Sequence, residues 1–328
     1  MKRQLINFLS KIPLINNYFS GIATIFMLHR ISDFEKDKLF PNENMKVSPR
    51  FLEKFIIECK NKGFEFISLD ELYDILQHNK KVDSYKIVMT LDDGYKDNYE
   101  IAYPIFKKHN VPFTIYLTTS FPNKTALLWW YSLEKLIIEN EKLKIKDKIF
   151  TCKTYEEKNR VFLEIRKMIL KLNQKELKQE LYEMFEGYDM DWYEFNNELC
   201  MSWEDVKNIS QDSLCTIGGH TINHYAFNKL SENEIINEIK LANKEIEQQI
   251  GKKVKHFAYP FGSRNEVEKR DLEITKKFNF KTVTTTRSGT IYLEHKNYAN
   301  CCLPRIMLVE NFDINNIGRI RKQRIVTE

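Results

Sequence analysis

Short apolar runs, rich in β-branched and aromatic residues, alternate along this chain with longer segments of helical period. A short run bounded by turn residues predicts a strand buried on both faces. Strands that alternate with helices imply a parallel sheet, either a barrel or a doubly wound sheet. The predicted strands are residues 22–28, 86–91, 112–117, 214–217, 256–259 and 281–285.

Capping residues mark where the helices between these strands begin. Ser48, which precedes a proline, opens one helix, and Asp70 is predicted to cap the next. Ser231 and Glu234 form a capping box before a long amphipathic helix that ends near Ile250. Each of these patterns supplies acceptors for the free amides of a first helical turn.

Residues 122–202 depart from this alternation, because they are long, charged and helical in period, with no convincing strand. We predict a helical insertion within a single α/β domain that spans residues 22–310. Residues 1–21 form an N-terminal amphipathic segment and residues 311–328 a C-terminal tail.

The N-terminal segment begins like a signal peptide, with basic residues before an apolar run. Lys11, Asn16 and Asn17 interrupt that run, and no small-residue cleavage site follows. No segment reaches the roughly 18 apolar residues that span a bilayer. We therefore expect a cytoplasmic protein, whose residues 2–19 either pack on the domain as a helix or lie on the anionic inner face of the membrane.

Composition excludes several classes of function. The balance of 51 Lys and Arg against 46 Asp and Glu gives a net charge of +5, too weak over 328 residues to indicate nucleic-acid binding. The six cysteines include no C-x-x-C pair, which argues against zinc-ribbon and thioredoxin-like sites and favours reduced thiols. Nothing in the sequence indicates an oligomeric state.

The first candidate for chemistry is Asp92-Asp93-Gly94, directly after a predicted buried strand. Adjacent carboxylates repel one another, so two at a strand end are costly unless a cation or a proton intervenes. The carboxyl end of a parallel strand is also where α/β enzymes carry their reactive groups. A solvated Asp-Asp-Gly turn is the alternative interpretation.

The second candidate is the pair His220 and His224, again directly after a strand. Two imidazoles four residues apart can bind one metal if the segment between them turns helically, and Gly218 and Gly219 permit close backbone approach. The alternative is a surface turn with an incidental histidine pair.

Together the two clusters predict a catalytic metal site. Asp93, His220 and His224 supply one oxygen and two nitrogens and leave coordination positions open, whereas structural zinc sites are closed by four protein ligands. We expect one divalent ion, with zinc as the default and iron, cobalt or nickel also compatible. Asp92, next to a ligand but free, is then a candidate general base toward a water activated by the metal.

A third candidate is the turn after residues 256–259, where Pro260 precedes Phe261. Proline restricts the backbone here, and the Phe261 amide could donate to a developing oxyanion. A proline-containing strand end without chemistry is the alternative.

These segments resemble the motifs of the polysaccharide deacetylases, the carbohydrate esterases with NodB homology. Residues 90–94 (TLDDG) are similar to the family's TFDDG, residues 220–224 (HTINH) to its H-[ST]-x-x-H metal motif, and residues 259–262 (YPFG) lie where its P-Y motif would. The resemblance covers roughly residues 22–309. It implies a distorted (β/α) barrel with about seven parallel strands, here carrying the helical insertion.

The resemblance also implies an activity and residue roles. The reaction is removal of acetate from an N-acetylated sugar, usually an N-acetylhexosamine. Asp92 is the base, Asp93, His220 and His224 are the metal ligands, and the Phe261 amide belongs to the oxyanion hole.

Three family features are missing. Phe257 and Ala258 stand where the family often carries an arginine that orients the base, and the late L-x-H motif is here Leu303-Pro304-Arg305. The D-x-x-x-W motif is not visible. We predict that Arg305 approaches Asp92 in place of the missing arginine, against the alternative of a surface ion pair.

A general acid must then come from elsewhere. His29, at the end of the first predicted strand, is the candidate for protonating the leaving amine, and a strand-end histidine without chemistry is the alternative. Some branches of the family resemble this early histidine.

The sequence thus predicts a metal-dependent deacetylase. Its expected substrate is an N-acetylated sugar in a cell-surface glycan or in a nucleotide- or lipid-linked precursor. A wall of Trp129, Trp130 and Tyr131 is one interpretation for sugar stacking, and core packing is the other. Two alternatives stay open: an amidase of the same fold that acts on a non-sugar amide, and a glycan-binding pseudoenzyme.

Overall fold

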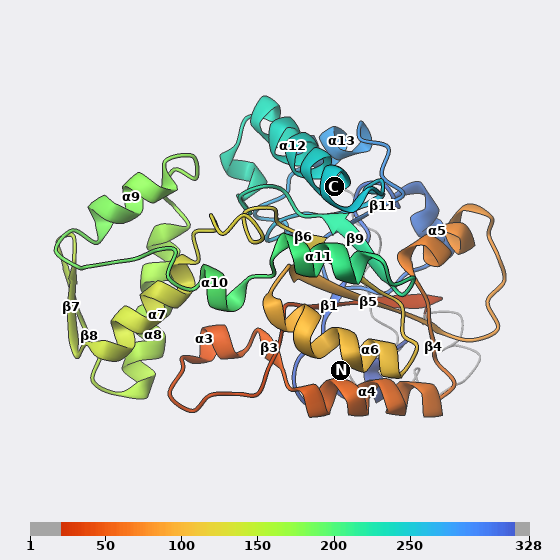
Figure 1. Ribbon diagram of the computed structural model, residues 1–328, viewed down its shortest axis with the longest axis horizontal. Coiled ribbons are helices and arrows are strands. Elements are labelled where there is room, and N and C mark those ends of the chain that lie inside the picture. The colour runs from red at the N-terminus through yellow and green to blue at the C-terminus, as the bar shows by residue number, and fades with distance from the viewer. Residues whose placement is uncertain (1–20, 319–328) are drawn as a thin grey trace, which may run out of the picture.

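The computed structural model describes residues 21–318, which form a curled parallel sheet covered by helices (Figure 1). Neighbouring strands follow the order β11-β10-β9-β6-β5-β1-β12, and β4 pairs with the start of β5. Every pairing in this sheet is parallel. The strands are β1 (Ala23–Leu28), β4 (Glu65–Phe66), β5 (Lys86–Asp93), β6 (Phe113–Leu117), β9 (Cys215–Gly219), β10 (His256–Ala258), β11 (Thr282–Thr284) and β12 (Ile306–Met307).

One late segment joins the two edges of this sheet. Leu303 forms a parallel bridge with Thr284 of β11, and Ile306 and Met307 pair with Phe26 and Met27 of β1. The segment therefore closes the sheet into a distorted barrel, which confirms the fold predicted from the sequence. Two-residue strands such as β12 have no detectable period, which is why the sequence patterns did not predict it.

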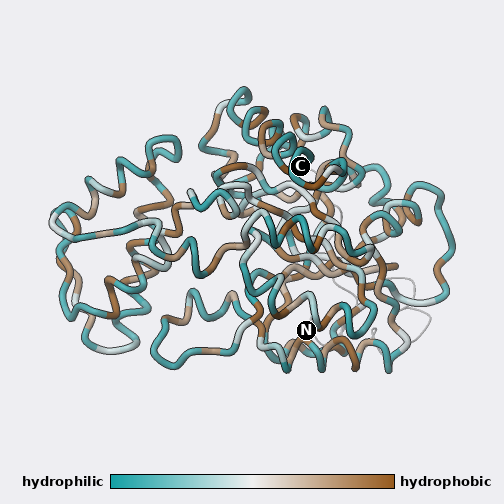
Figure 2. The backbone as a smooth tube through the Cα atoms, in the orientation of Figure 1, coloured by the Kyte–Doolittle hydropathy of each residue, from teal (hydrophilic) through white to brown (hydrophobic). Residues whose placement is uncertain are grey.

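The barrel strands are buried as their apolar runs require. All six residues of β1 and all eight of β5 are buried. In Figure 2 the hydrophobic trace concentrates in these central strands, while the outer helices are largely hydrophilic. The β5 strand extends two residues beyond its predicted end, so Asp92 and Asp93 are themselves strand residues.

The helices begin close to the predicted positions, with one correction. Ser48 accepts from the Phe51 amide at the start of α4, and a capping box at Ser231 starts α12. Ser68, not Asp70, caps α5, and Asp70 instead forms an ion pair with Lys281. The barrel helices are α4 (Pro49–Asn61), α5 (Leu69–Gln77), α6 (Tyr103–Lys108), α11 (Trp203–Ser210), α12 (Glu232–Ile250) and α13 (Lys269–Lys276). Helix α6 is preceded by a π-helical turn, η1 (Asn98–Ala102).

The predicted insertion stands at one side of the barrel, at the left of Figure 1, and has a hydrophobic core of its own. The expectation that it has no strand is wrong, since β7 and β8 form an antiparallel hairpin. The insertion elements are α7 (Trp129–Glu139), β7 (Lys142–Ile145), β8 (Lys148–Thr151), α8 (Tyr155–Ile169), α9 (Leu177–Met184) and α10 (Asn196–Leu199).

The segment that follows β1, from β2 to β3, connects the barrel to the insertion. A small second sheet pairs β2 (Arg30–Ile31) with β3 (Lys46–Val47), and α3 (Phe40–Glu43) lies between them in sequence. The Leu39 amide donates to Glu134 of α7 at 2.7 Å, and the Phe40 amide donates to Asn159 of α8 at 2.8 Å. Backbone groups of this segment thus hold the insertion in place.

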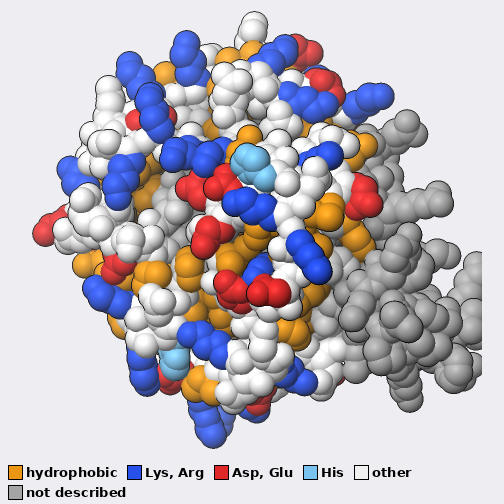
Figure 3. Space-filling view, turned by 90° about the vertical axis from the view of Figure 1, so that its right-hand side faces the viewer, with side chains coloured by type: hydrophobic (Ala, Val, Ile, Leu, Met, Phe, Trp, Pro, Cys, Tyr) orange, Lys and Arg blue, Asp and Glu red, His pale blue; other side chains and the backbone are white. Residues whose placement is uncertain are grey.

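The C-terminal part of the described chain differs from the prediction. Residues 311–318 do not form a separate tail, because Ile314 and Ile317 are buried in the barrel core. The amphipathic segment predicted at residues 2–19 lies outside the described residues. Within residues 21–318, no helix combines the length and apolar character needed to cross a membrane. On the face in Figure 3, basic and acidic side chains are interspersed, as the near-balanced composition predicts.

Candidate metal centre and active site

Asp92 and Asp93 end β5 in a sharp turn. Asp93 has a φ of 77°, in the left-handed region that non-glycine residues rarely adopt, and Gly94 follows with a φ of 98°. Because an L side chain is strained at this φ, and a Cβ on Gly94 would also lie 2.5 Å from Leu117 Cδ1, the exit favours glycine. Backbone strain of this kind at a non-glycine residue is typical of functional sites.

His220 and His224 lie on the loop after β9. They converge without the predicted helical turn, because Thr221 and His224 both adopt positive φ, at 68° and 57°. The His220 Nδ1 is 2.7 Å from the Ala258 carbonyl oxygen. That contact makes Nδ1 the protonated nitrogen and leaves Nε2 with a free lone pair, the form in which a histidine binds a metal.

The ligand atoms of Asp93, His220 and His224 all lie within 4.8 Å of one another. Asp93 Oδ1 is 3.5 Å from His220 Nε2 and 3.4 Å from His224 Nε2. This oxygen is buried and has no hydrogen-bond partner among the described residues. A buried carboxylate oxygen without a partner is costly, and a cation between the three atoms would remove that cost. The residues therefore fit a divalent metal.

The electrostatics of the site suit this role. Burial lowers the pKa of both His220 and His224 to about 4, so both imidazoles are neutral near pH 7. Burial also raises the pKa of Asp93, and it outweighs the opposing interactions with His29 and His220. Neutral imidazoles and a carboxylate in need of a positive neighbour are the donors that divalent metals bind.

Asp92 has a different environment from its neighbour. Burial, the largest single effect, raises the pKa of Asp92, but the charge and hydrogen bonds of Arg305 together with the interactions of His220 and His29 outweigh it and lower the pKa to about 2. Arg305 Nη1 donates to Asp92 Oδ1 at 2.6 Å, and Nη2 donates to Oδ2 at 2.7 Å. The guanidinium is buried, and its Nε donates to the Thr285 carbonyl at 3.0 Å. Arg305 thus pairs with Asp92 as predicted, and the alternative of a surface ion pair is wrong.

His29 lies at the end of β1, facing the same site. The His29 imidazole interacts electrostatically with Asp92, Asp93 and His224. The His29 Nδ1 is buried and has no hydrogen-bond partner among the described residues, while its carbonyl accepts from Asn98 Nδ2 at 2.8 Å. The backbone of His29 is therefore held by a hydrogen bond, while the Nδ1 of its ring remains available for proton transfer.

Phe261 occupies the turn after β10 with a φ of 58°. Its ring centroid lies 4.8 Å from that of His224. The Phe261 carbonyl accepts from Thr286 Oγ1 at 2.6 Å, whereas its amide donates none of the hydrogen bonds found among the described residues. The amide is thus free to donate beside the predicted metal ligands.

The sequence prediction did not include Glu238, which holds the histidine loop in place. This carboxylate of α12 accepts from the amides of Ile222 and Asn223, both at 3.0 Å, and from Asn223 Nδ2 at 2.6 Å. Glu238 is buried on the apolar stripe of α12, beside Ile235 and Ile239. An acid on the buried face of an amphipathic helix was the signal that could have identified it.

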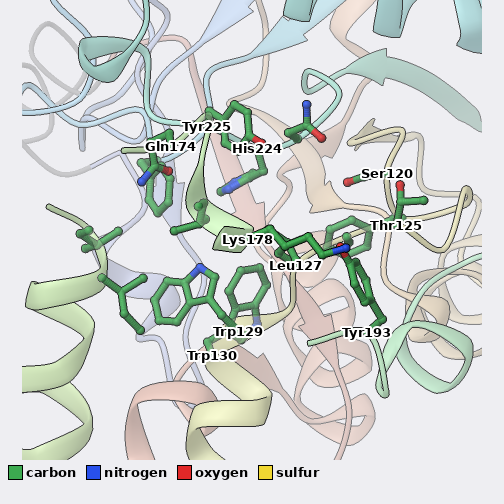
Figure 4. Close-up of a pocket in the computed structure, with 17 residues that line it drawn as sticks. Ser120, Thr125, Leu127, Trp129, Trp130, Gln174, Lys178, Tyr193, His224 and Tyr225 are labelled. Carbon is green, nitrogen blue, oxygen red and sulfur yellow. The ribbon is translucent and has the colours of Figure 1, made fainter. Parts of the chain in front are cut away.

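A cavity of about 210 Å³ opens between these residues and the insertion. In Figure 4, His224 and Tyr225 lie on one side of it and Trp129 and Trp130 on the other. Trp129 is mostly buried in the insertion core, whereas Trp130 is only half-buried. Tyr131 does not line the cavity and instead accepts from Arg30 Nη1 at 2.7 Å. The predicted aromatic wall is therefore Trp129 and Trp130 alone.

A family model described as polysaccharide deacetylase matches residues 79–283, more than half of the chain. The chain belongs to the polysaccharide deacetylase family. This confirms the resemblance found from the motifs and, at the level of the family, the predicted class of hydrolase. A relative named "Putative polysaccharide deacetylase YxkH", from Bacillus subtilis (strain 168), is 29% identical over 93 residues. Those residues are 28% of this polysaccharide deacetylase and 30% of the relative, so the chain matches less than a third of that protein's length.

Solved structures with similar folds cover nearly the whole chain. The deacetylase PplD from Streptococcus pyogenes, solved in complex with acetate, has a TM-score of 0.61 at 19% identity, covering 91% of this chain and 98% of that one. A de-N-acetylase from Aggregatibacter actinomycetemcomitans has a TM-score of 0.57 at 15% identity, covering 91% and 99%. At these identities the likeness shows the fold.

Proposed function

We propose that this polysaccharide deacetylase hydrolyses the acetamide of an N-acetylated sugar and depends on one divalent metal, zinc by default. The observation that supports this most is the division of labour between adjacent acids. Asp93 lies beside two neutral imidazoles, whereas the adjacent Asp92 interacts electrostatically with His220 and is paired with Arg305. One acid is thus suited to bind a cation and the other to accept a proton.

A metal held by Asp93, His220 and His224 would polarise the acetamide carbonyl and activate water. Asp92 is ionised at neutral pH and accepts the proton of the attacking water. The two-point contact with Arg305 orients this carboxylate and keeps it charged. The low pKa makes Asp92 a weaker base, and the fixed orientation of its carboxylate offsets this loss.

The Phe261 amide is available to stabilise the tetrahedral oxyanion, and His29 to donate a proton to the leaving nitrogen. The carbon–nitrogen bond then breaks, yielding acetate and the free amine of the sugar. His29 supports this role through its position beside Asp92 and its unbonded Nδ1.

The proposal includes a location and a class of substrate. We propose a cytoplasmic reaction, or one at the inner face of the membrane, on a nucleotide-linked, lipid-linked or growing glycan.

The test is a panel of nucleotide- and lipid-linked N-acetylhexosamines, incubated with metal-loaded protein and followed by mass spectrometry for loss of an acetyl group. Cyclic imides and small non-sugar amides are included in the same panel. Loss of acetyl from at least one sugar supports the proposal. Metal-loaded protein that hydrolyses only non-sugar amides, or nothing, would refute it, and protein that never retains metal would indicate a pseudoenzyme.

A further inference from the structure

The cavity beside the candidate metal centre has an unusual charge distribution. His224 and Phe261 line it from the barrel, and residues of the insertion line it from the opposite side. Its lining includes one lysine, Lys178, and no aspartate or glutamate. The carboxylates of Asp92 and Asp93 lie deeper and are engaged by Arg305 and the predicted metal.

Lys178 is the second residue of α9 and is not neutralised by a neighbouring acid. The two closest acids along its own chain contact Asn173 instead: Glu176 accepts from its Nδ2 at 3.2 Å and Glu180 from its amide at 3.3 Å. In the part of the chain that the structure describes, Lys178 forms no ion pair, whereas Lys175 pairs with Glu234 of α12.

An aromatic ring positions the Lys178 ammonium at the cavity. The Lys178 Nζ lies 5.2 Å from the centroid of the Tyr193 ring, within the range of a cation–π interaction. Figure 4 shows the lysine side chain extending toward Tyr193 along the insertion side of the cavity. The contact favours one orientation of a flexible side chain and leaves its charge unneutralised.

The potential in this cavity favours a negatively charged ligand. A divalent ion at one end and an ammonium on the opposite wall, with no carboxylate in the lining, attract anions into a space partly shielded from water. The position of Lys178 in the first turn of α9 adds to this, because a cation there opposes the helix dipole unless an anion lies beside it. A neutral sugar would leave the Lys178 ammonium without an anionic partner, and it would leave the unfavourable position of that cation in the first turn of α9 uncompensated.

We propose that Lys178 binds an anionic group, a phosphate or a carboxylate, carried by the N-acetylated sugar whose acetamide reaches Asp93, His220 and His224. The inference rests on the proposed function and narrows its substrate class to anionic amino sugars. The insertion is then the specificity element of this chain, since it supplies Lys178, Tyr193 and Trp130.

The test compares pairs of sugars of which only one member carries an anionic group: N-acetylglucosamine 1-phosphate with methyl N-acetylglucosaminide, and N-acetylmuramic acid with N-acetylglucosamine. We expect the metal-loaded wild type to release acetate from at least one anionic member with a kcat/KM about tenfold or more above its neutral partner, the size of one hydrogen bond to a charged group. K178A removes that preference by raising KM with little change in kcat, and K178R retains it. Lys171→Ala, an exposed lysine outside the cavity lining, is the matched control and changes neither constant.

Equal kcat/KM on charged and neutral partners, or a K178A variant that keeps the preference, overturns the inference and leaves the proposed function intact. If no sugar loses its acetyl group, the proposed function fails, and binding then decides the inference separately. Calorimetry with the two anionic sugars in the D92N background supports it if adding K178A weakens the affinity for either of them about tenfold. If adding K178A leaves the affinity for both sugars unchanged, the inference is overturned.

Discussion

Arg305 and Asp92 form a buried two-point ion pair across 213 positions of sequence, with Nη1–Oδ1 at 2.6 Å and Nη2–Oδ2 at 2.7 Å. The arginine lies directly before β12, the segment that closes the barrel, and the aspartate lies near the end of β5. Closure of the fold therefore also places the cation that controls the candidate base. The arginine that is missing at positions 257 and 258, in β10, is thus replaced by one that directly precedes β12.

Removing Arg305 is expected to affect stability and catalysis together. Arg305→Met leaves Asp92 buried without a cation, and such losses cost about 3–5 kcal/mol of unfolding free energy. Arg305→Lys keeps the charge but cannot form the two-point contact, so it should lose less stability and still lower kcat. Denaturant unfolding and acetate release measure the two effects. Wild-type stability in Arg305→Met would show that the pair is not needed to offset burial.

Asp92→Asn is expected to abolish turnover without displacing the metal. The amide has nearly the same shape as the carboxylate but cannot accept a proton from water, and losing a general base costs about 10²–10⁴ in rate. Metal content measured by elemental analysis should equal that of wild type, since Asp92 is not among the predicted ligands. Turnover near the wild-type rate would exclude Asp92 as the base.

His224→Ala is expected to lower metal affinity with little loss of fold, because its side chain is more exposed than that of His220. Two protein ligands bind a divalent ion more weakly than three, so a chelator should strip the variant at lower concentration and activity should fall in parallel. His78→Ala, at an exposed position on the C-terminal side of α5, is the control. Equal metal retention in wild type and His224→Ala would refute the predicted ligand set.

His295 is expected to make the chain less stable in mild acid. Burial lowers its pKa to about 4, and its Nδ1 accepts from the Tyr292 amide at 2.9 Å. Between about pH 6.5 and pH 4, His295 therefore binds a proton in the unfolded chain but not in the folded chain. Its contribution to the free energy of unfolding is complete above about pH 6.5 and is lost as the pH falls toward 4. The loss is on the order of 3 kcal/mol by pH 4.

The measurement is denaturant unfolding from pH 7 to pH 4, with a chelator present so that metal release does not contribute. His295→Asn keeps an acceptor for the Tyr292 amide but does not titrate, so its stability should fall less steeply than that of wild type over this range. Identical slopes for the two proteins would assign the acid sensitivity to other groups.

Local patterns were sufficient for the elements and residues whose signal lies within a few positions. Buried strands such as β1 and β5 are visible because burial on both faces excludes polar residues from a continuous run. The β7–β8 hairpin was missed although β7 alternates lysines with apolar residues at the period of a strand, because its two four-residue strands are short and lie between longer segments of helical period.

What the sequence by itself determined is the chemistry available at each strand end: two adjacent acids after one strand and two histidines after another. Only the tertiary structure decided which groups meet. The Arg305–Asp92 pair joins residues 213 positions apart, and the Glu238 contacts and the Lys178–Tyr193 contact each join an element to a separate loop. Periodicity reports burial over a few residues, whereas such meetings depend on how a closed barrel and its insertion pack in space.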